Sequence, residues 1–282
     1  MKGVVIKMKL LFLDPTTAEH MTGDVRLRVC QPSEMRLAFK RDRPYAVGDI
    51  TTIDEQVISL VIFNKQLAEN LKIESPYKTV FDGDWTIDFL ESTVKDVTND
   101  INGDGVINSD DQWGFLGDSF VHFYQASDLA MSGKNANGKY TIDMNNERSM
   151  TVLSDIYDFL VVNPNTGSWV MDGRKVNEMF LMGNTLYQTT TLRPITTLRN
   201  ADIEFGILPL PKYDENQENY STPMTSNNCP SAVIPVSCAD PEMSATVTEA
   251  LCYYGYKILT PANYDVYLKS KIARDNDSEV SK

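Results

Sequence analysis

The sequence predicts an α/β protein whose sheets are mainly parallel and whose length is sufficient for two lobes. Short apolar runs that suit strands alternate with helix-like segments, which is the order expected when crossover helices connect parallel strands. The 282 residues exceed what one small core requires. A hydrophobic content of 42% and a charged content of 23% are those of a globular protein rather than a disordered one.

The first elements of this alternation are a buried strand at residues 57–63 and a helix at residues 65–71. The next helix is capped by Thr86 and is expected to end near Thr98. Its apolar residues recur at helical spacing and define one buried face: Ile87, Leu90, Val94 and Val97. A strand at residues 112–116 and a Gly/Asn-rich turn at residues 133–138 follow.

The second half starts with a helix near Asn146, for which four apolar residues are expected to point inward: Met150, Leu153, Ile156 and Leu160. A helix at residues 175–182 ends before Gly183, which suits the position after a helix. Strands are predicted at residues 185–189, 205–208 and 232–235. A further helix starts with Asp240 as cap and Pro241 in the first turn, and it is expected to reach about residue 259. Thr260 and Pro261 repeat this start signal.

Composition argues against several function classes. The formal net charge of −13, from 39 acidic and 26 basic residues, does not suit a nucleic-acid partner, which needs a basic surface to replace phosphate counterions. Neither of the two histidines, His20 and His122, lies in a nucleophile or H-E-x-x-H setting, so histidine-based catalysis is not expected. The four cysteines form no C-x-x-C pair. We expect free thiols, with a bridge between Cys229 and Cys238 left open.

Residues 100–111 fit the calcium-binding loop of EF-hand proteins. Calcium takes roughly six to eight oxygen ligands, and such a loop supplies them from fixed positions around an obligatory glycine. Gly105 stands at the glycine position, and Ile107 supplies the apolar anchor. The predicted calcium ligands are Asp100, Asn102, Asp104, the carbonyl oxygen of Val106, Asn108 and Asp111.

Two features distinguish this loop from a complete EF-hand. Its last ligand is Asp rather than Glu, so Asp110 is an alternative ligand to Asp111. The segment after the loop has strand character, which makes the motif similar to the single loops of dockerin-like modules. The alternative is an Asn/Asp/Gly-rich turn without metal. We expect a structural Ca2+ that joins a helix end to the next strand, because no partner hand is present to support a sensor opening.

Six short motifs occur along the chain in a defined order. They are Y-A-V-G-D at 45–49, F-N-K-Q-L at 63–67, G-D-W-T at 83–86, D-Q-W-G at 111–114, F-G-I-L-P-L-P-K at 205–212 and A-V-I-P at 232–235. In sequence and order they resemble the family-1 extracellular solute-binding proteins of ABC sugar importers, in a Gram-positive branch that also carries the calcium-type loop. The resemblance covers roughly residues 45–277, and it rests on the shared order because each motif alone is weak.

The resemblance implies a two-lobed fold of the periplasmic-binding-protein type (type II), with crossing strands at a hinge and the ligand between the lobes. Residues 1–62 and 233–282 would form an incomplete first lobe, and residues 63–232 the second lobe with the loop at 100–111. The implied function is non-catalytic capture of a carbohydrate by hinge closure, for delivery to the permease of an ABC transporter. We expect a monomer with no nucleic-acid partner.

The same resemblance implies an extracellular protein held at the cell surface as a lipoprotein. No export signal is recognisable, because the apolar run at residues 10–13 is short and is followed by Asp14 and Pro15. No run is long enough for a transmembrane helix. Residues before about 37 do not match the first strands of the family, and the family continues beyond residues 274–282, so we expect a product truncated at both ends.

A sugar site needs polar groups for hydroxyls and aromatic faces for the apolar side of the ring. Matched by position to the cleft segments of the family, the predicted ligand-binding residues are Asp49, His122, Tyr124, Gln125, Thr190, Arg193, Asn227 and Asn228. Other roles stay open for three of them: a core aromatic for Tyr124, an interior histidine for His122 and a surface charge for Arg193. Trp85 and Trp113 are expected to be packing residues.

Three other interpretations stay open. A carbohydrate-active enzyme with a structural calcium ion would need two carboxylates facing the bond to be cleaved, and no motif singles out such a pair among 39 acidic residues. A calcium-dependent interaction module related to dockerins would carry paired loops on a shorter chain, whereas one loop is found. The third is a fragment of a solute-binding protein that no longer binds its solute.

Overall fold

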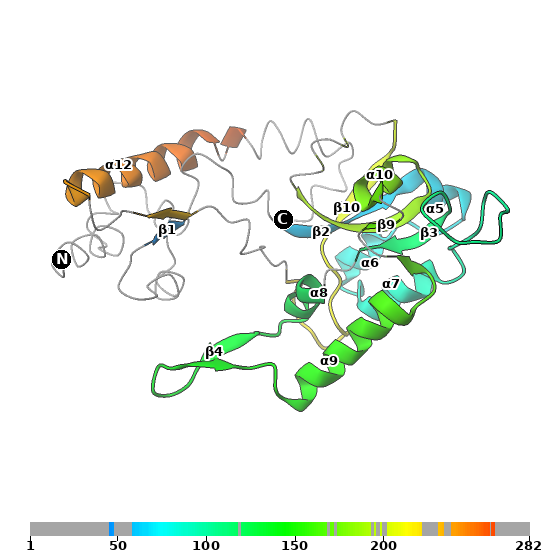
Figure 1. The fold of residues 1–282 in the computed structure, drawn as a ribbon, viewed down its shortest axis with the longest axis horizontal. Coiled ribbons are helices and arrows are strands. Elements are labelled where there is room, and N and C mark those ends of the chain that lie inside the picture. Colours follow the sequence, from blue (N-terminus) through cyan, green and yellow to red (C-terminus); the bar gives the residue numbers. More distant parts are fainter. Residues whose placement is uncertain are drawn as a thin grey trace. The chain divides into compact units, whose positions relative to one another are not determined.

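The computed structural model describes residues 45–47, 58–117, 120–167, 170–171, 174–192, 202–221, 231–233 and 238–259, together with residues 195, 198, 261 and 262. The chain divides into two compact units. The first contains β1 (Tyr45–Val47), β11 (Ser231–Val233), α12 (Pro241–Tyr254) and the π-helix η3 (Gly255–Leu259). The second contains all elements from β2 to β10 (Figure 1).

In the first unit, β1 and β11 pair antiparallel, with Tyr45 opposite Val233. The predicted start of α12 is confirmed, because the Asp240 carboxylate accepts a hydrogen bond from the Met243 backbone N–H at 2.9 Å. The predicted end near residue 259 is reached in a different geometry, since the α-helix stops at Tyr254 and continues as the π-helix η3. The predicted helix start at Thr260 and Pro261 lies mostly outside the described residues.

The second unit is built on a five-stranded sheet of order β10-β2-β9-β3-β6. Its strands are β2 (Ser59–Asn64), β3 (Trp113–Leu116), β6 (Thr166–Gly167), β9 (Thr185–Thr191) and β10 (Phe205–Leu208). β9, β3 and β6 are parallel, whereas β2 runs antiparallel to both of its neighbours, β9 and β10. The prediction of mainly parallel sheets is therefore wrong, and the sheet is mixed.

The error has a physical reason. Alternation of strands and helices predicts parallel pairing only when a helix connects two strands that become neighbours. Here β2 pairs with β9 and β10, which follow it by more than a hundred residues, and not with β3, the next strand of the sheet. The intervening helices therefore do not fix the direction of β2.

Helices cover both faces of this sheet. They are α5 (Lys65–Asn70), α6 (Tyr77–Asp82), α7 (Ile87–Val94), α8 (Phe120–Ala126), α9 (Glu147–Tyr157) with the π-helix η2 (Asp158–Val162), and α10 (Val176–Leu181). Figure 1 shows α10 on one side of the strands and α7 to α9 on the other. Two short hairpins complete the unit: β4 (Ser132–Lys134) with β5 (Tyr140–Ile142), and β7 (Val170–Met171) with β8 (Arg174–Lys175).

One face of the sheet, here called the core face, carries the side chains of Phe63, Tyr187 and Phe115, which are paired across β2, β9 and β3. α6 covers it through an edge-to-face contact of Tyr77 with Phe63, at 5.4 Å between ring centroids. α8 covers it through Phe123, 6.0 Å from the Phe115 ring. These rings belong to one large buried cluster that also contains Trp85 and Tyr187, so the predicted packing role of Trp85 is confirmed.

The predicted cap of α7 is confirmed, because the Thr86 side chain accepts a hydrogen bond from the Phe89 N–H. Ile87, Leu90 and Val94 are buried as expected, but the helix ends at Val94 rather than near Thr98. Asp96 has a φ of 60°, a left-handed conformation that does not continue a helix. The prediction for this helix is therefore right for its start and its buried face and four residues too long.

In α9 and η2, three of the four residues predicted to point inward do so: Ile156 and Leu160 are buried and Leu153 packs against the core, but Met150 does not. Met150 is 58% exposed, whereas Ser149, Val152 and Ile156 are buried. The Tyr124 hydroxyl donates a hydrogen bond of 2.9 Å to Ser149 Oγ inside the core, so Ser149 occupies the buried face and Met150, the next residue, lies outside it. The expectation that Met150 points inward is wrong for this reason.

The two-lobe division stays a prediction, and its bounds differ from those of the two compact units. The predicted boundary after residue 62 falls within β2, all six residues of which lie in the sheet of the second unit. Strand residues joined to both neighbours by hydrogen bonds move with their sheet, so the change of unit comes before Ser59 in this structure.

Candidate functional site: one edge of the mixed sheet

The carboxyl ends of β3, β6 and β9 lie at one edge of the sheet, beside the first residue of β2. In open α/β sheets, ligands bind outside the carboxyl ends of the strands, because the chain leaves the sheet there and loops can diverge around a solute. This edge contains Ser59, Gly117 and the run Thr189–Thr191, so it is rich in small polar residues. We call it the polar edge.

Gly117 brings the backbone after β3 very close to β9. A Cβ atom on Gly117 would lie 1.9 Å from Thr189 Oγ1 and 3.2 Å from Thr189 Cβ, and the φ of this glycine is +144°. Any side chain at residue 117 would collide with Thr189 and would also adopt a conformation that L-residues avoid. Glycine is therefore required at this position for the polar edge to form.

α8 starts directly after the polar edge and carries three of the predicted ligand-binding residues. His122 and Gln125 are half-buried and lie three residues apart, which places them on the same side of the helix. Burial lowers the pKa of His122, so the imidazole favours its neutral form. A neutral imidazole and an amide are suitable hydrogen-bond partners for a sugar hydroxyl.

The other predicted ligand-binding residues are not brought together in this way. Tyr124 is 1% exposed in the core and its hydroxyl is used by Ser149, which favours its alternative role as a core aromatic. Thr190 is buried on the face of β9 opposite to Thr189, and its hydroxyl donates a long hydrogen bond of 3.4 Å to the carbonyl oxygen of Thr191. The remaining four lie outside the described residues: Asp49, Arg193, Asn227 and Asn228.

Ser59, Gly117 and Thr189 were not predicted from the sequence. Ser59 is the first residue of β2, which the sequence predicts only as a buried apolar strand. Thr189 is the neighbour of Thr190, the threonine that was predicted to bind the ligand. Alternation along the run T-L-Y-Q-T-T-T at residues 185–191 was the available signal, because it places Thr189 on the same face as Tyr187. Neither the partner strands nor the approach of Gly117 can be read from a local pattern.

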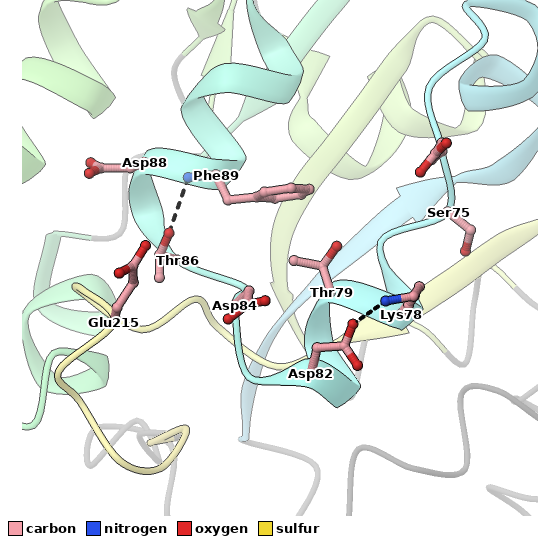
Figure 2. Close-up of a pocket in the computed structure, with 10 residues that line it drawn as sticks. Ser75, Lys78, Thr79, Asp82, Asp84, Thr86, Asp88, Phe89 and Glu215 are labelled. Atoms are coloured by element: carbon pink, nitrogen blue, oxygen red, sulfur yellow. Dashed lines mark hydrogen bonds and ion pairs between the residues drawn. The ribbon is translucent and has the colours of Figure 1, made fainter.

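A separate hollow of about 610 Å3 lies between α6 and the start of α7 (Figure 2). Its lining carries five carboxylates and one ammonium group: Glu74, Asp82, Asp84, Asp88, Glu215 and Lys78. Figure 2 shows Lys78 joined to Asp82 and the Thr86 hydroxyl joined to the Phe89 N–H. This excess of negative charge does not suit an anionic ligand. The hollow contains none of the predicted ligand-binding residues.

The loop at residues 100–111 is folded around its own acidic side chains. The Asp100 carboxylate accepts backbone hydrogen bonds from Gly105 at 2.7 Å and from Gly103 at 2.6 Å, and these bonds lower the pKa of Asp100. The Asp111 carboxylate is 1% exposed and accepts backbone hydrogen bonds from Ile101 and Asn108. Gly103 and Gly105 have φ angles of 76° and 82°, which allow the sharp turn.

These features suit a calcium loop in part. Carboxylate and amide oxygens are the ligands that calcium prefers, and Asp100, Asn102 and Asp104 supply them within a single turn. Within the described residues, no group of three or more His, Cys, Asp or Glu side chains is gathered closely enough to hold a metal ion. A calcium ion here would therefore depend on Asn and carbonyl oxygens as well as on carboxylates.

Comparison with known proteins gives a likeness in structure and not in sequence. No family model matches the chain, and no curated protein matches it. None of the helices in the described ranges is long and apolar enough to cross a membrane. Several hundred solved chains match in fold, and those with the better superpositions include proteins bound to oligosaccharides.

An ABC substrate-binding protein from Listeria monocytogenes in complex with cycloalternan superposes with a TM-score of 0.52 at 12% identity, over 79% of this chain and 53% of that one. A maltose/maltodextrin-binding domain from Bdellovibrio bacteriovorus bound to maltotriose gives 0.55 at 17%, over 90% and 59%. A cyclo/maltodextrin-binding protein complexed with maltotetraose gives 0.56 at 14%, over 92% and 64%.

These likenesses define the class of fold. The chain has the α/β fold of sugar-binding solute-binding proteins of ABC importers, which confirms the predicted fold class. It spans 53% to 64% of the length of these three proteins. Because identity is below 20% in each case, the likeness concerns the fold, and the ligand of this chain has to be argued from its own residues.

Proposed function

We propose that this protein captures a carbohydrate without chemical turnover and delivers it to the permease of an ABC importer. The observation that carries the proposal is that a chain with this fold also has polar side chains at the ends of its strands. The fold is that of solute-binding proteins, the edge where such sheets receive ligands carries hydroxyl groups, and the helix that begins three residues after Gly117 carries a half-buried imidazole and a half-buried amide. These groups donate and accept hydrogen bonds without net charge, as a neutral polyol requires.

The mechanism proposed is capture by hinge closure. Contacts from both lobes would exist only in the closed state, so a bound sugar increases the population of that state. Affinity then reflects hydrogen bonds to sugar hydroxyls, and selectivity arises because an analogue that lacks a hydroxyl leaves a buried polar group unpaired. Three solved proteins of this fold are bound to cycloalternan, maltotriose and maltotetraose, which makes a glucose oligosaccharide the first class to test.

The loop at residues 100–111 is proposed to bind Ca2+ in a structural role. The support is the match of its residues to the calcium pattern and the two left-handed glycines that shape its turn. Asp100, Asn102, Asp104, the Val106 carbonyl oxygen, Asn108 and Asp111 would hold the ion. The backbone of Asn99 pairs with that of Gln112, so an ion in the loop would stabilise the connection between α7 and β3.

Location and partners follow from the proposed role. An importer component that captures sugar works outside the cytoplasmic membrane, so we propose an extracellular protein anchored as a lipoprotein and acting as a monomer. Its partner would be the permease of the transporter.

A thermal-melt screen tests the proposed function. The saccharide panel is glucose, maltose, maltotriose, maltotetraose, cellobiose and xylobiose, each measured with excess calcium and again with chelator. A ligand that binds only the folded protein, at a hundred times its Kd, adds about 2.7 kcal/mol to the free energy of unfolding, so one sugar class should raise the melting temperature clearly. No shift with any sugar would indicate a fragment that has lost its site, and release of monosaccharide would indicate an enzyme.

A further inference from the structure

Among the residues that the structure describes, the buried hydroxyl groups of Ser59 and Thr189 at the polar edge lack hydrogen-bond partners. Ser59 and Thr189 are each 1% exposed, and neither Ser59 Oγ nor Thr189 Oγ1 has a partner within the described part of the chain. Buried side-chain hydroxyls are nearly always paired, because burial without a partner costs the free energy of the lost hydration. These two groups therefore require an explanation.

The register places the two hydroxyls next to each other. Val61 is opposite Thr189 and Ser59 is opposite Thr191, so Ser59 and Thr189 are diagonal neighbours on the core face, with Cα atoms roughly 7–8 Å apart. At this separation, one small polar group between the side chains can bond to both. Gly117 adjoins Thr189 from the neighbouring strand, and the Thr189 hydroxyl occupies the place that a Cβ atom at residue 117 would take, 1.9 Å from Thr189 Oγ1.

The hydroxyl groups of Ser59 and Thr189 suit a neutral ligand group that can both donate and accept a hydrogen bond. A hydroxyl group can donate to one of these oxygens and accept from the other, whereas a charged group would be buried without a counter-charge. We propose that Ser59 and Thr189 form a subsite for one hydroxyl group of the bound saccharide, a role that rests on the proposed function. Because both side chains are almost fully buried, entry of the sugar hydroxyl requires a local shift at Gly117.

Thr185 provides a matched control within the same strand. It is also 1% exposed, its Oγ1 also has no partner in the described ranges, and it lies on the same face of β9 as Thr189. It stands at the other end of β9, away from the polar edge. A general effect of removing a buried, unpaired hydroxyl would appear in Thr185→Val as well as in Thr189→Val.

The experiment is isothermal titration of the whole chain with the panel sugar that gives the largest thermal shift. The variants are Ser59→Ala, Thr189→Val, Thr189→Ser and the double variant Ser59→Ala/Thr189→Val, with Thr185→Val as control. We expect Ser59→Ala and Thr189→Val each to weaken binding about 5- to 10-fold, as loss of one neutral hydrogen bond does. Thr185→Val should bind like the wild type, and Thr189→Ser, which keeps the hydroxyl group, should recover most of the affinity that Thr189→Val loses.

The double variant should bind no more than about 2-fold more weakly than the weaker single variant, because both side chains bond to one hydroxyl group. Equal affinity of the wild type, Ser59→Ala and Thr189→Val would overturn the subsite and leave the proposed function intact; a buried water molecule would then explain the two hydroxyls. A wild type that binds no sugar of the panel would overturn both. Ser59→Ala gives an independent measurement if Thr189→Val does not fold.

Discussion

The Trp85 indole N–H donates a hydrogen bond of 3.0 Å to the carbonyl oxygen of Pro209, a residue 124 positions further along the chain. Trp85 is fully buried and lies just before the cap of α7, whereas Pro209 follows directly after β10. The neighbouring backbones are also paired, since the Lys212 N–H donates to the Trp85 carbonyl oxygen. The motifs at residues 83–86 and 205–212 are therefore hydrogen-bonded to each other, and we call this contact the Trp85 joint.

Trp85→Phe is expected to reduce the free energy of unfolding by about 2–4 kcal/mol. The change removes a buried hydrogen bond, leaves the Pro209 carbonyl oxygen unpaired and opens space in the core. Urea unfolding followed by far-UV circular dichroism measures the effect. Tyr157→Phe, at an aromatic residue that is 49% exposed, is the control and should change stability by less than about 0.5 kcal/mol. Equal stability of the two variants would show that the Trp85 joint is not formed.

Gly117→Ala is expected to destabilise the second unit by about 1–3 kcal/mol or more. The new methyl group would collide with Thr189 Oγ1, and the left-handed backbone adds strain. Gly138→Ala is the matched control, because Gly138 has a φ of +73° but open space around it, so only the backbone cost of about 1–2 kcal/mol applies. The double variant Gly117→Ala/Thr189→Ala should recover part of the loss. A loss no larger than that of Gly138→Ala would contradict the close approach.

We expect the free energy of unfolding to depend on pH through His122. Its pKa is lowered in the folded protein by burial, so the unfolded chain binds a proton more readily than the folded chain. The stability that this neutral imidazole contributes is complete above its unfolded pKa of about 6.5 and is lost as pH falls through the lower folded pKa. Melting temperatures measured from pH 7.5 to 5 should fall less for His122→Gln than for the wild type. Parallel curves would refute this contribution.

Calcium is expected to stabilise the folded chain. Addition of millimolar calcium after chelation should raise the melting temperature, and Asp100→Asn or Asp104→Asn should reduce this increase, because each removes charge from the proposed ligands. Glu215→Gln, at an exposed carboxylate of the hollow in Figure 2, should respond to calcium like the wild type. A response to magnesium equal to that for calcium, unchanged in the Asp variants, would indicate nonspecific screening.

What could be predicted from the sequence is what local chemistry determines. The cap at Thr86, the end of a helix before Gly183 and the strand at residues 205–208 depend on neighbouring residues, and each is found in the structure. The features that the sequence did not predict depend on contacts with residues far along the chain. The direction of β2 depends on β9 and β10, and the burial of Ser149 rather than Met150 at the start of α9 accompanies its hydrogen bond with Tyr124.

The same division holds for the site. His122 and Gln125 could be chosen because a resemblance identified their segment, and the structure places both half-buried on α8, which begins three residues after Gly117. Ser59 and Thr189 become neighbours only through the register of β2 and β9, which no local pattern contains. Tyr124 has the residue type of a sugar contact, and its burial in the core is decided by packing.

Isothermal titration of the wild type with the panel sugars, followed by chromatography of the recovered sugar, tests the central claim most directly. Capture without turnover predicts saturable binding of about one sugar molecule per chain for one sugar class, with the sugar recovered unchanged. Absence of binding heat for every sugar, or recovery of cleaved sugar, would contradict the claim.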